Sequence, residues 1–151
     1  MKKFILFFCT LIISLTTKSQ FVARADIKEK INGLCDQKNV YALLPILKGQ
    51  EEASCSENDS TIEQKLNNDV TFLKDKPDYE DKGMVSIIIN CNNEVLKFET
   101  DNKTKSSELD EQILSVFKTF TKWKSGKLNG KKVDSIKLIS FTISKSRIKL
   151  N

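Results

Sequence analysis

The sequence contains no histidine, only two prolines, a single tryptophan and no long hydrophobic run. Without histidine, the Ser-His and Cys-His pairs that activate nucleophiles are excluded, and so is the commonest general base. The cysteines form no C-x-x-C pair, which argues against a zinc site, and there is no glycine-rich phosphate loop. We therefore expect no catalytic residue, no metal and no cofactor, and a protein that is not an enzyme.

The first residues are typical of a secretory signal peptide. Met1-Lys2-Lys3 is basic, residues 4–15 are almost entirely apolar, and Thr17-Lys18-Ser19 is a small-x-small cleavage pattern. The apolar run has about 12 residues, whereas a helix needs about 20 to cross a bilayer. We predict that residues 1–19 are removed and that the protein is exported, periplasmic or secreted, with no stable membrane insertion after cleavage.

Charge is unevenly distributed along the chain. The formal net charge of +5 falls to +2 once Lys2, Lys3 and Lys18 are removed, so net charge does not support nucleic-acid binding. Residues 50–82 carry ten Asp/Glu and four Lys, whereas residues 113–151 carry ten Lys/Arg and one Asp. This pattern fits two solvated faces that partly neutralise each other, or a basic surface that faces an acidic partner or anionic lipid.

Three cysteines follow the predicted signal peptide, namely Cys35, Cys55 and Cys91. An exported protein meets oxidising conditions, so one disulfide and one free thiol are expected. We predict a Cys35–Cys55 bridge, because both residues lie in the N-terminal half, outside the predicted hairpin.

Apolar spacing predicts the order of the elements. Short helices are expected around residues 26–35 and 40–47, and a capped helix from Ser60. A β-hairpin follows, with strands over residues 83–90 and 94–100, and then an amphipathic helix over residues 107–121. The last strand is expected over residues 136–143. The predicted fold class is α+β, with two layers: a three-stranded antiparallel sheet with a long helix packed on one face, preceded by short N-terminal helices.

The connection between the long helix and the last strand is the most specific motif. It reads W-x-x-G-x-x-N-G-K-x-V, with Trp123, Gly126, Asn129 and Gly130 at its fixed positions. Together with Gly83 at the start of the first strand, this order resembles the TonB C-terminal domain family. The resemblance divides the chain into residues 1–19 (signal peptide), 20–58 (N-terminal helical and loop extension) and 59–151 (TonB-like domain).

Some features depart from the family pattern. Ser125 stands where the family usually has proline, and Val70-Thr71-Phe72 stands where a Tyr-Pro step is common. With two prolines in all, the chain also lacks the proline-rich spacer and the membrane anchor of a full energy-transducing protein.

The resemblance implies a non-enzymatic binding module of the bacterial cell envelope, which captures a peptide by β-augmentation. The partner would be an envelope protein or peptide, such as an outer-membrane transporter, and Lys137 and Lys145 would favour an acidic peptide. The edge strand that receives it would contain Ile136, Lys137, Leu138, Ile139, Phe141 and Ile143.

Two alternative functions stay open. One is a structural envelope protein with no transport role. The other is an enzyme accessory whose only conceivable acid/base groups are Asp36, Glu51 and Glu52.

Overall fold

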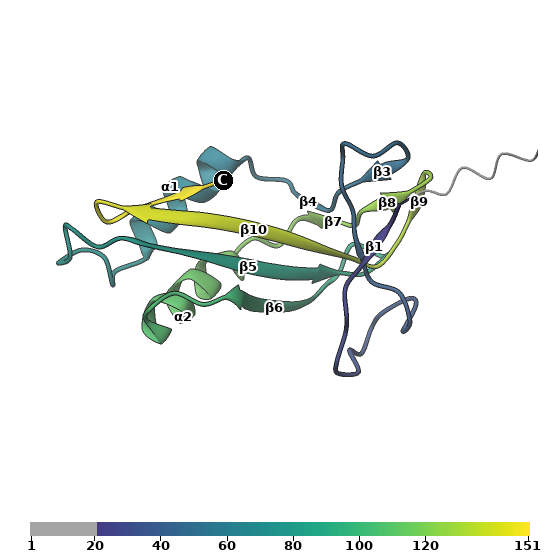
Figure 1. Ribbon diagram of the computed structural model, residues 1–151, viewed down its shortest axis with the longest axis horizontal. Coiled ribbons are helices and arrows are strands. Elements are labelled where there is room, and N and C mark those ends of the chain that lie inside the picture. Colours follow the sequence, from purple (N-terminus) through teal and green to yellow (C-terminus); the bar gives the residue numbers. More distant parts are fainter. Residues whose placement is uncertain (1–20) are drawn as a thin grey trace, which may run out of the picture.

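Two β-branched segments form the centre of the structure, a computed structural model that describes residues 21–151 (Figure 1). The predicted signal peptide lies outside the described residues. Strand β5 (Asp81–Ile89) and strand β10 (Ser135–Ser144) run antiparallel, in continuous register from Ser135↔Ile89 to Ile143↔Asp81. In β10 the buried apolar side chains of Ile139, Phe141 and Ile143 alternate with more exposed residues, as expected of a strand that carries a core on one face. In β5 all residues from Val85 to Ile89 are buried, so this part of the strand is covered on both faces.

The main sheet has six strands in the order β1-β2-β10-β5-β6, and β11 pairs with β10. Its other strands are β1 (Ala23–Arg24), β2 (Tyr41–Ala42), β6 (Val95–Asn102) and β11 (Arg147–Leu150). All neighbours in this sheet are antiparallel except β2 and β10, which pair in parallel through Ser135 and Tyr41.

Two smaller sheets join the N-terminal segment to the connection that follows the second helix. One contains β3 (Gln50–Glu51), β8 (Lys127–Leu128) and β9 (Lys131–Lys132). The other pairs β4 (Ser54–Cys55) with β7 (Trp123–Lys124). The Trp-Gly-Asn-Gly motif therefore forms short strands that hold residues 50–55 in place.

Two helices of 11 residues each complete the structure: α1 (Asp59–Asp69) and α2 (Ser107–Phe117). The N-caps are Asn58 and Ser106, whose side chains accept the backbone N–H groups of Thr61 and Leu109. The helices pack on one face of the sheet. They bury Ile62 and Leu66 of α1, and Leu109, Ile113, Val116 and Phe117 of α2, in one core with the inward residues of β5 and β10.

The predicted fold class is wrong in its assembly. The sheet has six strands rather than three, and α2 ends at Phe117 instead of continuing to residue 121. No helix forms between residues 21 and 58, where short helices were predicted. Gly33 in this segment has a φ of +92°, which lies outside the helical range and interrupts a helix. On either side of it, β1 pairs with β2, and Tyr41 of β2 pairs with Ser135 of β10.

Candidate functional site

Strand β10 has unequal neighbours on its two sides. On one side β5 pairs with it from Ser135 to Ile143. On the other side β2 pairs only with Ser135, and β11 pairs only from Phe141 onward. The Asn151 N–H also donates to the Ser140 carbonyl at 3.1 Å. The predicted edge strand is therefore not the edge of the sheet, but it is unpaired on one side across a short central stretch.

The direction of the peptide groups shows which atoms this stretch offers. The carbonyl of Asp134 accepts the Tyr41 N–H at 2.9 Å, and the carbonyl of Ser140 faces the same side. Because peptide groups alternate sides along a strand, the N–H and C=O groups of Ile136 and Leu138 also face away from β5. The parallel bridge between Ser135 and Tyr41 pairs the Ile136 N–H with the Tyr41 carbonyl. Within residues 21–151, no backbone partner or side chain binds the Ile136 C=O or the N–H and C=O of Leu138. We call residues 136–138 of this side the open stretch.

A cavity of about 190 Å³ lies beside the open stretch. Lys137, Leu138 and Ile139 line one side, residues 52–55 line another, and Trp123 and Ile62 are also in its wall. This volume is below the ~300–1,000 Å³ typical of small-molecule sites. It suits one side chain of a bound chain better than a whole substrate.

Cys55, beside the cavity, contributes further backbone groups without a partner. The Ser56 N–H donates to the Lys122 carbonyl at 2.9 Å, which continues the pairing of β4 with β7. By alternation, the peptide groups of Cys55 face away from β7, and no partner for them is found in the part of the chain that the structure describes. The Cys55 thiol is free and half-buried.

Charged and aromatic side chains around the cavity are mostly committed to structural contacts. Lys137 pairs with Glu52 at 2.7 Å, with both side chains partly exposed. Trp123 is buried, and its indole N–H donates to the Phe120 carbonyl at 2.8 Å. Trp123 is therefore part of the core, and it forms the cavity wall rather than a binding group.

The structure divides the predicted site residues between two faces. Phe141 and Ile143 are buried in the core, so their side chains cannot meet a partner, whereas the buried side chain of Ile139 also lines the cavity. Ile136 and Leu138 lie on the opposite face, and Leu138 is 42% exposed. The backbone of the open stretch, Leu138 beside it and the cavity walls are left for recognition.

The other edges of the sheet are protected. The Asn67 side chain of α1 pairs with both backbone groups of Ile148 in β11, at 2.8 and 2.9 Å. Glu63 accepts the Leu150 N–H at 2.8 Å. The pairing of β6 has register shifts near both ends, its outer face carries Lys97 and Glu99, and β1 has only two residues. Capping, irregular pairing, charge and short length are the usual defences of sheet edges.

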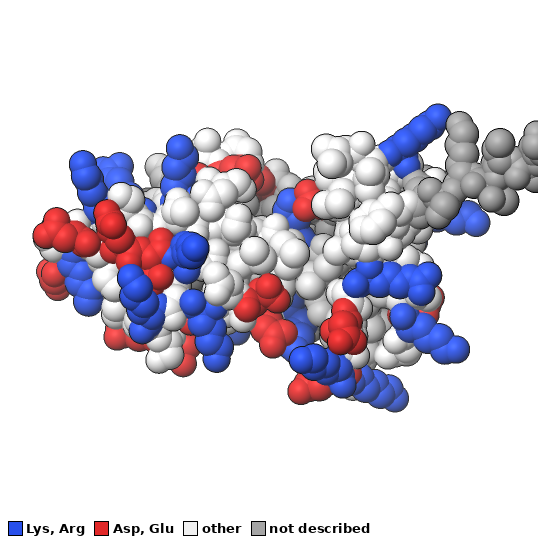
Figure 2. Space-filling view, viewed as in Figure 1, with Lys and Arg blue, Asp and Glu red and all other residues white. Residues whose placement is uncertain are grey.

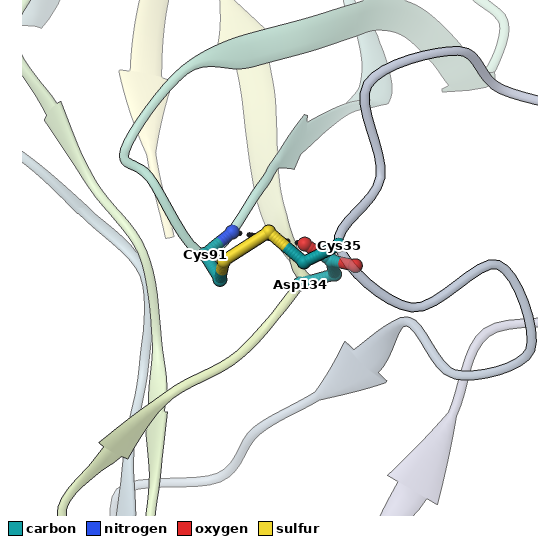
Figure 3. Close-up of side chains that lie close together, drawn as sticks. All are labelled: Cys35, Cys91 and Asp134. Atoms are coloured by element: carbon teal, nitrogen blue, oxygen red, sulfur yellow. Dashed lines mark hydrogen bonds between the residues drawn. A yellow bond between two sulfur atoms is a disulfide. The ribbon is translucent and has the colours of Figure 1, made fainter.

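The predicted Cys35–Cys55 bridge is wrong, because the disulfide joins Cys35 to Cys91 (Figure 3). The buried carboxylate of Asp134 lies beside it and accepts the N–H of Cys91 at 2.9 Å and the N–H of Asp36 at 2.6 Å. The disulfide and this carboxylate together hold residues 35–36 against the turn between β5 and β6. A disulfide did form, as expected for an exported protein, but its partner comes from a turn that is distant in sequence.

Cys35, Cys91 and Asp134 place their donor atoms within 4.8 Å of one another, as metal ligands would. Thiolates are the metal-binding form of cysteine, whereas both sulfurs here are in the disulfide. Both carboxylate oxygens of Asp134 also accept backbone N–H groups. These three residues therefore form a structural cross-link rather than a set of metal ligands.

The acidic residues considered for an enzyme accessory have structural partners. Glu51 pairs with Lys127 at 2.7 Å, and Glu52 pairs with Lys137. The Asn39 side chain and the Lys38 N–H donate to Asp36 and lower its pKa, which makes it a weaker base. None of these contacts resembles a base held next to a nucleophile.

Comparisons with protein-family models, with curated proteins and with solved structures found no match to this chain. The resemblance to the TonB C-terminal family therefore stays a prediction from the motif. Among residues 21–151, no helix combines the length and the apolar character needed to span a bilayer.

Proposed function

We propose that this protein is an exported, non-enzymatic binding module that captures an extended peptide of an envelope protein at the open stretch of β10. The observation that carries the proposal is the set of outward-facing, unpaired backbone groups formed by the Ile136 C=O and by the N–H and C=O of Leu138. A bound strand would pair with these groups by β-augmentation. The resemblance to TonB C-terminal domains supports the same mode of binding.

The borders of the open stretch limit what can bind. Tyr41 of β2 closes one end and Asn151 closes the other, through their bonds to Asp134 and Ser140. Only a few residues of a partner can pair between them, at about 3.3 Å per residue. One of their side chains would enter the adjacent cavity, so we expect a short linear motif as the ligand.

The charges near the cavity change the expected sign of the ligand. Lys137 is already paired with Glu52, and Lys145 lies at the far end of β10, in the turn to β11. Glu57 and Asp59 line the cavity and form no salt bridge with another described residue. The site therefore suits a peptide with a cationic side chain better than the acidic peptide expected from the sequence.

A proline scan of the open stretch tests the proposal. Binders are selected from a displayed library of random heptapeptides, and the affinity of each synthetic peptide is measured by fluorescence anisotropy. Leu138→Pro removes an N–H that faces the gap and leaves the pairing with β5, so we expect at least a tenfold loss of affinity. Leu138→Ala keeps the N–H and is the matched control, with an expected loss below threefold.

Hydrogen exchange gives a second readout that does not depend on the proline variant being folded. A bound peptide should slow the exchange of the Leu138 amide of the parent protein, which has no partner in the free protein. Selected binders that leave this amide unprotected would contradict the proposal. So would an alanine variant as impaired as the proline variant, because recognition would then depend on the side chain.

A further inference from the structure

Three of the four large hydrophobic residues that are exposed in the described chain lie at one end of the molecule. They are Phe21 (68% exposed), Leu44 (42%) and Ile46 (89%). Single exposed apolar residues are normal on protein surfaces, but a cluster of them marks an interaction site. We call Phe21 and residues 44–46 the apolar tip.

Hydrogen bonds hold the apolar tip together. The Leu47 N–H donates to the Leu44 carbonyl at 2.9 Å, which closes a turn with Pro45 and Ile46 at its corner. The buried side chain of Gln50 joins this turn to the start of the described chain. Its amide donates to the Phe21 carbonyl at 2.7 Å and accepts the Leu44 N–H at 3.0 Å. The exposure of Ile46 is therefore built into an ordered turn.

Basic residues surround the apolar tip. The Asn129 N–H donates to the Gly49 carbonyl at 2.6 Å, which places the β8–β9 hairpin and its Lys131 and Lys132 beside the turn. Residues 21–25, 41–51 and 126–133 together carry five Lys/Arg and one Glu, a balance of +4. The one acid, Glu51, is paired with Lys127. In Figure 2 the charged side chains next to the grey residues are blue.

The first 20 residues of the sequence join the described chain at Phe21, at the apolar tip (Figure 1). The location is independent of the open stretch, which is formed by different residues of β10.

From these observations we propose that the apolar tip docks on an anionic phospholipid bilayer. Ile46 and Leu44 enter the interface between headgroups and acyl chains, and Lys131 and Lys132 contact the anionic headgroups. Apolar burial combined with basic residues is the general basis of interfacial membrane binding. A convex turn with an isoleucine at its corner suits insertion into lipid better than it suits a flat protein interface.

Vesicle co-sedimentation of the exported protein tests the docking. We expect binding to vesicles of phosphatidylglycerol mixed with phosphatidylcholine, and at least tenfold weaker binding to phosphatidylcholine alone or in high salt. Ile46→Asp should weaken binding at least tenfold, and its exposed position predicts an unchanged thermal unfolding curve. Lys131→Gln/Lys132→Gln should weaken binding about fivefold for each lysine. Lys103→Gln/Lys149→Gln removes the same charge far from the tip and should have little effect.

The variants also distinguish docking through the tip from binding through a leader or through net charge. A retained leader is common to parent and variants, so binding that Ile46→Asp leaves unchanged would overturn the proposal. Equal effects of the two lysine pairs would do the same, since net charge alone would then account for the binding. Sedimentation velocity without lipid tests self-association. A dimer that Ile46→Asp dissociates, with no vesicle binding by the parent, would assign the tip to a second copy of the chain.

Discussion

Single side-chain carboxylates and amides connect several segments of this structure through hydrogen bonds. Asp134 joins the N-terminal segment to the β5–β6 turn, Asn67 and Glu63 cap β11, and Gln50 joins Phe21 to Leu44. Each of these bonds links residues far apart in sequence or caps a backbone that would otherwise be unpaired. Such groups look like ordinary surface polar residues in the sequence, which is why none of them was predicted.

Asp81 gives a pH prediction at this scale. Partial burial works to raise its pKa, but hydrogen bonds from the N–H groups of Lys105 and Lys82 and from the Tyr79 hydroxyl outweigh it and lower the pKa. Burial and the bond to Asp81 raise the pKa of Tyr79 to about 12, so Tyr79 remains a donor at neutral pH. A carboxylate with a lowered folded-state pKa stabilises the fold above its unfolded pKa, and this contribution is lost as pH falls through the folded pKa.

We therefore expect Asp81→Asn to lower the free energy of unfolding by about 1–2 kcal/mol at neutral pH. The difference from the parent should shrink near pH ~3, below the usual pKa of aspartate. Urea unfolding at both pH values measures it, and Asp75→Asn in the neighbouring loop is the control. A difference that stays constant with pH would mean that the carboxylate charge does not contribute.

Local sequence patterns indicate where several helices and strands lie, but they do not determine how these elements assemble. β5, β6, α2 and β10 lie close to the residues expected from apolar spacing and capping. β1, β2 and β4 have two residues each and form only through partners that are distant in sequence. Two residues have no detectable periodicity, so neither the six-stranded sheet nor the open stretch beside β10 could be predicted.

The disulfide shows the same limit. Cys35 was paired with the cysteine nearer in sequence, whereas the fold brings Cys91 to it across a separation of 56 residues. Of the candidate site, the sequence located the strand but assigned its whole length to partner binding. The borders of the open stretch depend on β2 and β11, and neither was recognised.

The contribution of one element to stability can be tested at the hairpin turn between β10 and β11. Lys145 and Ser146 form its turn with φ values of 49° and 57°, a two-residue connection that favours asparagine and glycine. Lys145→Asn should raise the free energy of unfolding by about 0.5–1 kcal/mol, because asparagine adopts the left-handed conformation more readily than lysine. Thermal and urea unfolding measure the gain. Lys149→Asn, which makes the same change in strand β11, is the control. A similar gain in the free energy of unfolding there would mean that the turn conformation is not the cause.

The whole molecule consists of a main hydrophobic core and an N-terminal segment whose buried residues, Val40 and Leu43, lie outside that core cluster. The main core cluster begins at Ala53 and contains no residue from positions 21–52. That segment is held by the disulfide, by Asp134, by the Asn90 side chain that donates to the Gly33 carbonyl, and by the short strands β1 to β3. Regions with few core contacts open at a lower free energy than the rest of a fold.

Removing the disulfide should therefore release this segment before the core unfolds. Cys35→Ser/Cys91→Ser is expected to lower the free energy of unfolding by up to about 4 kcal/mol, the chain-entropy value for a separation of 56 residues. Hydrogen exchange should accelerate over residues 21–43, while the amides that join β5 to β10 stay protected. Cys55→Ser, which keeps the disulfide, is the control and should change neither.

The same variant connects stability to the proposed binding. Tyr41 of β2 borders the open stretch through its bond to the Asp134 carbonyl, so a released segment would lengthen the unpaired side of β10. Peptides selected on the parent should then bind the double variant at least as tightly, and longer peptides should gain more than short ones. Uniformly faster exchange across the whole sheet would show instead that the disulfide stabilises the fold as one unit, and that β2 does not limit the site.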